Sequence, residues 1–145
     1  TAQSGGTSQT LSSYEEGTWT PVMRDSAANQ IIAITSTTAN YTKIGRLVWV
    51  NVETTRNTSS TFSGTLTLTG LPFSTSAKAS YSANNGTAWF DGTGTDDVTT
   101  IHAGRTTTSA LFKKVGENSS YLGSAEFESQ RPFYASFWYM STDGD

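Results

Sequence analysis

The feature that most limits the fold of this chain is the alternation of apolar and polar residues in short segments. In Ser63–Thr69, Leu66 and Leu68 alternate with threonines, which is the period of a strand with one buried face. Three valines repeat the same spacing in Leu47–Thr55. No long window shows the 3.6-residue period of a capped amphipathic helix, so we expect strands alone.

The composition agrees with many short strands joined by tight turns. Hydrophobic residues are 34% and charged residues 14% of the 145 residues, and the remainder is rich in Thr, which suits strands, and in Gly, Ser and Asn, which suit turns. About eight to ten short strands predict an all-β fold, an antiparallel β-sandwich of jelly-roll type. The expected strands are Thr18–Arg24, Gln30–Thr37, Asn40–Ile44, Leu47–Thr55, Ser63–Thr69, Ala79–Ala83, Thr87–Phe90, Val98–Ala103, Thr106–Val115, Ser119–Phe127 and Pro132–Ser141.

The chain divides into a short arm and one domain. Thr1–Ser13 is rich in Gly, Ser, Thr and Gln, which is typical of a linker to a longer parent chain. Tyr14–Asp145 is long enough to bury a core of its own and is expected to be the β-sandwich domain. Gly45-Arg46 predicts a hairpin turn between two of its strands.

Three sequence blocks resemble the C-terminal module of bacteriophage tail fibres and tailspikes. They are Tyr-Glu-Glu-Gly-Thr-Trp-Thr-Pro-Val at Tyr14–Val22, the segment Asn40–Val50, and Thr-Leu-Thr-Leu-Thr-Gly-Leu-Pro-Phe at Thr65–Phe73. The resemblance covers the first half of the domain. It implies a virion protein of the phage tail that binds the host surface, locks a homotrimer, or does both, and it carries no catalytic residue to this chain.

Two expected strands have large apolar side chains on both faces. In Leu47–Val52 the valines take one face, and Leu47 and Trp49 take the other. In Pro132–Ser141 the residues Phe133, Ala135, Phe137 and Tyr139 alternate with Tyr134, Trp138 and Met140. The second face is covered either by loops or by identical subunits. We favour subunits, which makes Trp49, Trp138 and Met140 candidates for the interface of a homotrimer.

Charge and cysteine content argue against several classes of function. The net charge is −3 and the basic residues are scattered, so we expect no nucleic-acid partner. There is no cysteine and no apolar run long enough to span a bilayer, so neither disulfides nor membrane insertion is expected.

Signatures of catalysis and of cofactors are lacking. His102 is the single histidine and is expected to be structural. We expect this domain to have no cofactor, no metal and no enzymatic activity. Whether the parent chain is an enzyme is left open. Asp91, Asp96 and Asp97 are compatible with either a Ca²⁺ site or an Asp-rich turn, and we favour the turn. If the segment that contains the neighbours Glu15 and Glu16 is extended, their side chains point to opposite faces and cannot act together as a glycosidase pair.

Aromatic residues supply the remaining indication of a ligand. They are 12% of the chain, and Trp and Tyr combine a broad apolar face with a polar group, which suits sugars. The candidate glycan-binding residues surround an expected hairpin turn: Tyr81, Asn84, Asn85, Trp89, Phe90 and Asp91. The competing interpretation places Trp89 or Phe90 in the core.

These observations lead to three functional hypotheses. The leading one is a non-catalytic receptor-binding domain at the tip of a phage tail fibre or tailspike, which as a trimer recognises a bacterial capsule or lipopolysaccharide. The second is a purely structural trimerisation cap of a polysaccharide-degrading tailspike. The third is a glycan hydrolase or lyase with its site between subunits.

Overall fold

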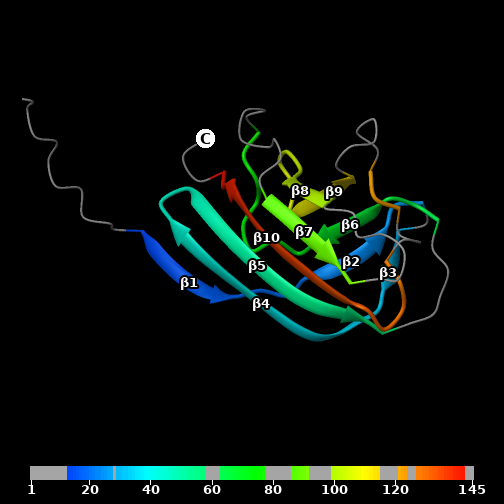
Figure 1. Ribbon diagram of the computed structural model, residues 1–145. Helices are drawn as coiled ribbons and strands as arrows, with labels where there is room; N and C mark the ends of the chain where they lie inside the picture. Colours follow the sequence, from blue (N-terminus) through cyan, green and yellow to red (C-terminus); the bar gives the residue numbers. More distant parts are fainter. Residues whose placement is uncertain are drawn as a thin grey trace, which may run out of the picture.

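The computed structural model describes residues 13–27, 29–57, 63–77, 86–91, 99–114, 121–123 and 127–142. These residues form ten antiparallel strands and no helix, which confirms the all-β prediction (Figure 1). The strands are β1 (Tyr14–Thr18), β2 (Val22–Asp25), β3 (Gln30–Ile32), β4 (Ile34–Ile44), β5 (Leu47–Arg56), β6 (Leu66–Thr69), β7 (Gly86–Phe90), β8 (Thr99–Ala103), β9 (Ser109–Lys114) and β10 (Pro132–Met140).

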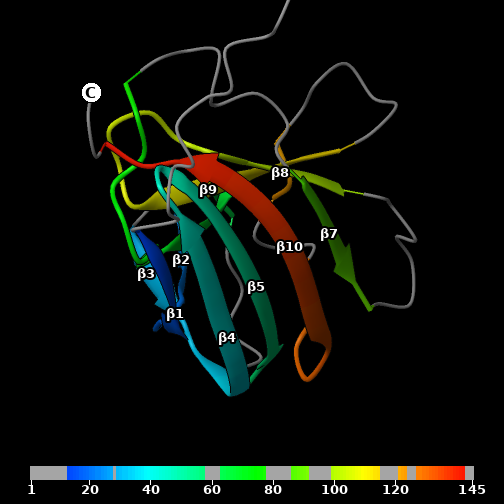
Figure 2. The same ribbon diagram turned by 90° about the vertical axis from the view of Figure 1, so that its left-hand side faces the viewer.

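All ten strands belong to one hydrogen-bonded sheet, in the order β1-β4-β5-β10-β7-β8-β9-β6-β2-β3. The sheet curls into a half-barrel, as Figures 1 and 2 show from two directions. We call β1, β4, β5, β10 and β7 the front half of the sheet, and β8, β9, β6, β2 and β3 the back half. The core lies on the inner, concave side of both halves.

The core is built from the alternate positions that face inward. Phe112 on β9 lies 5.5 Å from Phe90 on β7 and 5.4 Å from Phe133 on β10, measured between ring centroids. These contacts join the two halves of the sheet across the core. The inward positions expected from the sequence are buried, namely Val48, Val50, Val52, Leu66, Leu68, Phe133, Ala135, Phe137 and Tyr139.

The hairpin expected around Gly45-Arg46 is present. Ile44 pairs with Leu47 at the end of the β4–β5 ladder, and Gly45 has φ = 58°. That left-handed conformation is strained for most residues and is readily adopted by Gly. The hairpin fixes the register of the two longest strands, and therefore fixes which of their side chains lie opposite one another.

The expected strand Thr18–Arg24 is divided between two strands and the crossing that joins them. Thr18 ends β1 at one edge of the sheet, residues 19–21 cross between the two halves, and β2 begins at Val22 near the opposite edge. Pro21 lies in this crossing and has no N–H to donate to a ladder. Trp19 is anchored there by its backbone N–H, which donates to Ala39 O at 3.2 Å.

A second expected strand, Gln30–Thr37, is divided between two elements. Its first residues form β3 and its last residues begin β4. The ladder of β4 with β5 shifts register between Thr35 and Thr38, which is the effect of a β-bulge.

The Tyr-Glu-Glu-Gly block is the edge strand β1. Gly17 lies opposite Tyr41 on β4, and a Cβ on Gly17 would approach the Tyr41 ring to 2.7 Å, so only glycine leaves room for that ring. The Tyr41 hydroxyl donates to Glu15 Oε1 at 2.5 Å, and the Tyr14 hydroxyl donates to Glu16. The two carboxylates thus lie on opposite faces of β1, as the sequence predicted.

Candidate functional site

The candidate site is the outer face of the front half of the sheet, on the side away from the core. The register of β5, β10 and β7 arranges its side chains in rows across the strands. One row contains Trp89, Tyr134 and Glu53. The next row along the strands consists of Thr87, Ser136 and Asn51.

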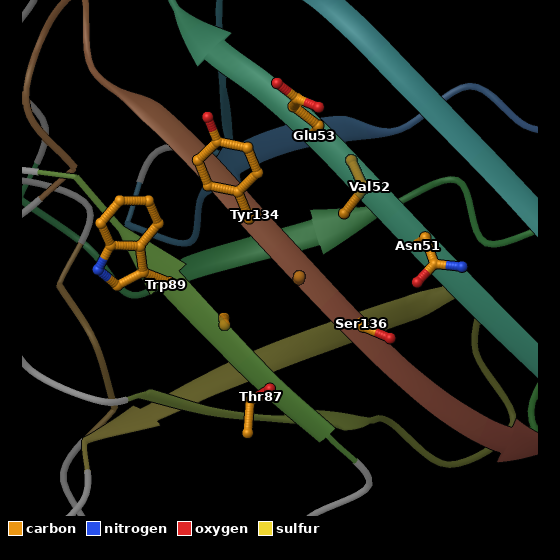
Figure 3. A pocket seen from close by; sticks show the side chains of 9 residues that line it. Asn51, Val52, Glu53, Thr87, Trp89, Tyr134 and Ser136 are labelled. Atoms are coloured by element: carbon orange, nitrogen blue, oxygen red, sulfur yellow. The ribbon is translucent and has the colours of Figure 1, made fainter.

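The first row contains an aromatic pair, which we call the platform and which consists of Trp89 and Tyr134. The two ring centroids are 5.3 Å apart and the ring planes meet at 23°, the geometry of an offset stack. Trp89 remains 50% exposed. Figure 3 shows Glu53 on the opposite side of Tyr134 from Trp89.

A shallow depression of about 460 Å³ lies beside the platform. Thr87, Ser136 and Asn51 cross it as a polar row, which is visible in Figure 3. The remaining lining residues are Val52, Glu53, Ala88, Trp89, Tyr134 and Ala135. The depression thus combines an aromatic surface, three hydroxyls including that of Tyr134, one carboxamide and one carboxylate, a set that can stack on a ring and hydrogen-bond to its substituents.

At the other end of the same face lies a second cluster, which we call the apolar patch. Its members come from four adjacent strands and pair across them: Tyr14, Ile44, Leu47, Trp49, Trp138 and Met140. Trp49 lies opposite Trp138, and they are 46% and 37% exposed. Of the eight large hydrophobic residues exposed in the described part of the chain, five belong to this patch. The Trp49 indole N–H donates to Asn51 Oδ1 at 3.3 Å.

The predicted ligand residues have different outcomes. Trp89 is on the outer face, in the platform. Phe90 is only 7% exposed and packs in the core against Phe112, Phe127 and Phe133. Its assignment as a glycan-binding residue is therefore wrong, because adjacent strand residues point to opposite faces and Trp89 takes the outer one.

The other predicted ligand residues are at or beyond the end of β7. Asp91 is partly buried just after β7, where its backbone N–H donates to Pro132 O at 3.1 Å. Tyr81, Asn84 and Asn85 lie outside the described residues, so their assignment stays a prediction.

The interface candidates lie together. Trp49, Trp138 and Met140 occupy the outer face in neighbouring positions of the β5–β10 ladder. Their own chain does not bury either tryptophan.

Sequence reasoning did not select Tyr134, Glu53, Asn51, Ser136 and Thr87 as ligand residues. The alternation of β10 did put Tyr134 on the face of Trp138. The missing information was the pairing of β10 with β7, which joins segments far apart in the chain and brings Tyr134 beside Trp89.

The described residues include no metal-type cluster of three or more His, Cys, Asp or Glu side chains. Asp96 and Asp97 lie outside these residues, so the choice between a Ca²⁺ site and a turn stays open. In the described ranges there is also no helix long and apolar enough to cross a membrane.

His102 belongs to the back half of the sheet, on β8. Its ring centroid is 6.2 Å from that of Tyr121. The pKa of His102 is lowered, mainly because the ring is partly buried and to a smaller extent because the positive charge of Lys113 is nearby. The histidine is thus on a different half of the sheet from the platform.

Comparisons of this chain with protein-family models, with curated proteins and with solved structures give no match. The chemistry of the outer face is therefore the basis for inferring a function.

Proposed function

We propose that this chain is a non-catalytic glycan-binding domain, and that the platform and its depression hold a sugar. The observation that carries the proposal is the exposed Trp89–Tyr134 stack beside a polar row. Sugars present apolar C–H faces that pack on aromatic rings, while their hydroxyls require donors and acceptors. Trp89 supplies the apolar surface, and Asn51 and Ser136 supply polar partners.

The open shape of the depression fits recognition of a polymer rather than enclosure of a small molecule. Its residues lie on three strands and leave the site accessible along the face. Each contact is then weak and partly mediated by water. We infer that the natural ligand is a bacterial capsule or lipopolysaccharide and that the domain is the receptor-binding tip of a phage tail fibre or tailspike.

The apolar patch supports a homotrimer as part of this proposal. Adjacent strands present Leu47, Trp49 and Trp138 to solvent beside the partly buried Met140, and such a cluster is typical of a contact between proteins. A second copy of this chain, related by closed rotational symmetry, is the proposed occupant. We propose that the front and back halves of the curled sheet, which share one core, correspond to the two layers of a jelly-roll type sandwich. Three linked sites in a trimer would raise the apparent affinity for a polymer.

A structural trimerisation cap is the second candidate function. The apolar patch favours it, because this patch contains most of the exposed apolar residues described and requires no ligand. The two functions differ in what they demand of the platform. A cap needs only the patch, whereas a receptor-binding domain also needs Trp89.

Replacing Trp89 with Ala separates the two functions. Titration with soluble oligosaccharides from capsules and lipopolysaccharides is expected to give an affinity about 30-fold lower than that of the unmodified chain, because truncating a stacked Trp removes about 2 kcal/mol. The matched variant Trp138→Ala, which truncates a tryptophan of the apolar patch, is expected to keep its affinity for the same soluble fragments. Unchanged binding in Trp89→Ala, or no binding by the unmodified chain, would support the cap.

A further inference from the structure

The outer face of the front half carries charge of one sign only. Its outward strand positions include two charged side chains, Glu16 on β1 and Glu53 on β5, and both are carboxylates. The cations of these strands lie elsewhere: Lys43 projects to the opposite side, where its ammonium lies 4.9 Å from the Phe73 ring centroid, and Arg56 is buried. A ligand on this face therefore meets two carboxylates, and no outward strand position carries a positive charge that offsets them.

Glu53 belongs to the depression itself. It lies directly opposite Tyr134 in the β5–β10 ladder, and it is the single charged side chain among the nine residues that line the depression. Among the described residues it has no cationic partner, since the ion pair found there joins Arg131 to Glu128. Its charge is thus available to a ligand in the site.

We infer that this site selects neutral or amine-bearing sugars over acidic ones, with Glu53 as the residue that determines this selectivity. The inference rests on the proposed glycan-binding function and narrows its ligand class. Two like charges about 4 Å apart in water repel by about 1 kcal/mol, which is about fivefold in affinity, and partial exclusion of water increases the penalty. An ammonium group on the sugar reverses the sign of the same interaction.

The test compares each neutral oligosaccharide that binds with its C6-oxidised derivative, in which one hydroxymethyl group has become a carboxylate. We expect the oxidised form to bind the unmodified chain at least about fivefold more weakly at low salt, with a smaller difference at high salt because counterions screen the repulsion. Glu53→Gln keeps the size and an acceptor oxygen and removes the charge. It is expected to bring the ratio of the affinities for the neutral and oxidised forms close to one, whatever its effect on the affinity for the neutral form.

Glu15→Gln is the matched control. It changes the net charge by the same amount, but its side chain contacts Tyr41 on the opposite side of β1, so it is expected to restore nothing. Equal or tighter binding of oxidised forms, or equal rescue by Glu15→Gln, would overturn the inference while leaving glycan binding in place. Absence of binding by every neutral, amine-bearing and acidic glycan would instead reject the proposed function, and the selectivity with it.

Discussion

The two ends of the outer face use similar residues in different surroundings. At one end Trp89 stacks on Tyr134 beside a depression crossed by hydroxyl and carboxamide groups. At the other end Trp49 lies opposite Trp138, and the adjoining row consists of Tyr14, Ile44, Leu47 and Met140. Both ends expose tryptophan, so exposure alone does not distinguish a ligand site from a subunit contact.

The difference lies in what accompanies the aromatic rings. A sugar needs polar partners next to an apolar surface. The platform provides the apolar surface, and the polar row beside it provides the partners. A second protein chain needs a broad apolar area that excludes water, which the patch provides. The polar row that contains Asn51 separates the two ends, and Trp49 is tied to this row by its hydrogen bond to Asn51. We therefore propose glycan binding for the platform and self-association for the patch.

The largest expected effect is a difference in stability between a variant in the core and a variant in the platform. Phe90→Ala empties a core position packed against three phenylalanines and is expected to lower the free energy of unfolding by about 3–5 kcal/mol. Trp89→Ala, one residue away, is expected to cost less, because its indole is half exposed; the stack on Tyr134 adds about 0.5–1.5 kcal/mol to the contribution of the area that the ring buries. Chemical denaturation of both variants measures the difference, and similar losses would mean that the platform is structural.

A charge placed in the apolar patch is expected to break the proposed trimer. Leu47→Asp puts a carboxylate among Ile44, Met140 and Trp49, and desolvating that charge in a subunit contact is unfavourable. The mass measured by light scattering should fall from three times 15.5 kDa to that of one chain. Apparent affinity for a glycan-coated surface should fall by about a hundredfold or more, because three linked sites become separate, while affinity for a soluble fragment stays the same.

Ile31→Asp is the control for this change. Ile31 is 61% exposed on β3, at the edge of the back half, so the same kind of charge is introduced outside the patch. The mass should remain that of the unmodified chain. Dissociation by Ile31→Asp but not by Leu47→Asp would indicate that the subunits meet through the back half of the sheet.

The smallest expected effect concerns pH. The single histidine is His102 on the back half, so neither end of the outer face has an imidazole, and glycan affinity and mass should be constant from about pH 6 to 8. Folding lowers the pKa of His102, so the unfolded chain binds the proton more tightly. The free energy of unfolding should therefore fall as the pH drops below about 6.5, and level off below the lowered pKa of the folded chain.

Denaturation curves at several pH values measure this dependence, and His102→Gln should reduce it. A shift of glycan affinity in the same pH range that disappears in His102→Gln would show that the histidine affects the platform through the β7–β8 ladder, contrary to the expected independence.

Local patterns in the sequence were sufficient to predict the elements that they govern. The alternation of Leu47–Thr55 predicted which side chains are buried, because the period of a strand is a property of neighbouring residues. Gly45 predicted the hairpin, because a tight turn needs a residue that tolerates positive φ. The same alternation placed Trp49 and Trp138 on the outer face, because the core residues of their strands occupy the inner face.

Features that depend on distant pairings could not be predicted. No local signal indicates that Tyr134 pairs with Trp89 or with Glu53, because register between distant strands is chosen by packing of the whole core. For the same reason Thr18–Arg24 resembled a single strand, although its two ends belong to opposite parts of the sheet. The choice between Trp89 and Phe90 as the exposed residue also depended on knowing which face of β7 meets the core.

The division of the outer face can be tested directly by ¹⁹F NMR of the chain labelled with 5-fluorotryptophan. The four tryptophans give four signals, and Trp19, which is buried, serves as the internal reference. Addition of a bound oligosaccharide should shift the Trp89 signal alone, and dissociation of the trimer by dilution should shift the signals of Trp49 and Trp138 alone. A Trp89 signal that does not respond to glycan, or Trp49 and Trp138 signals that respond to glycan and not to dilution, would contradict the assignment.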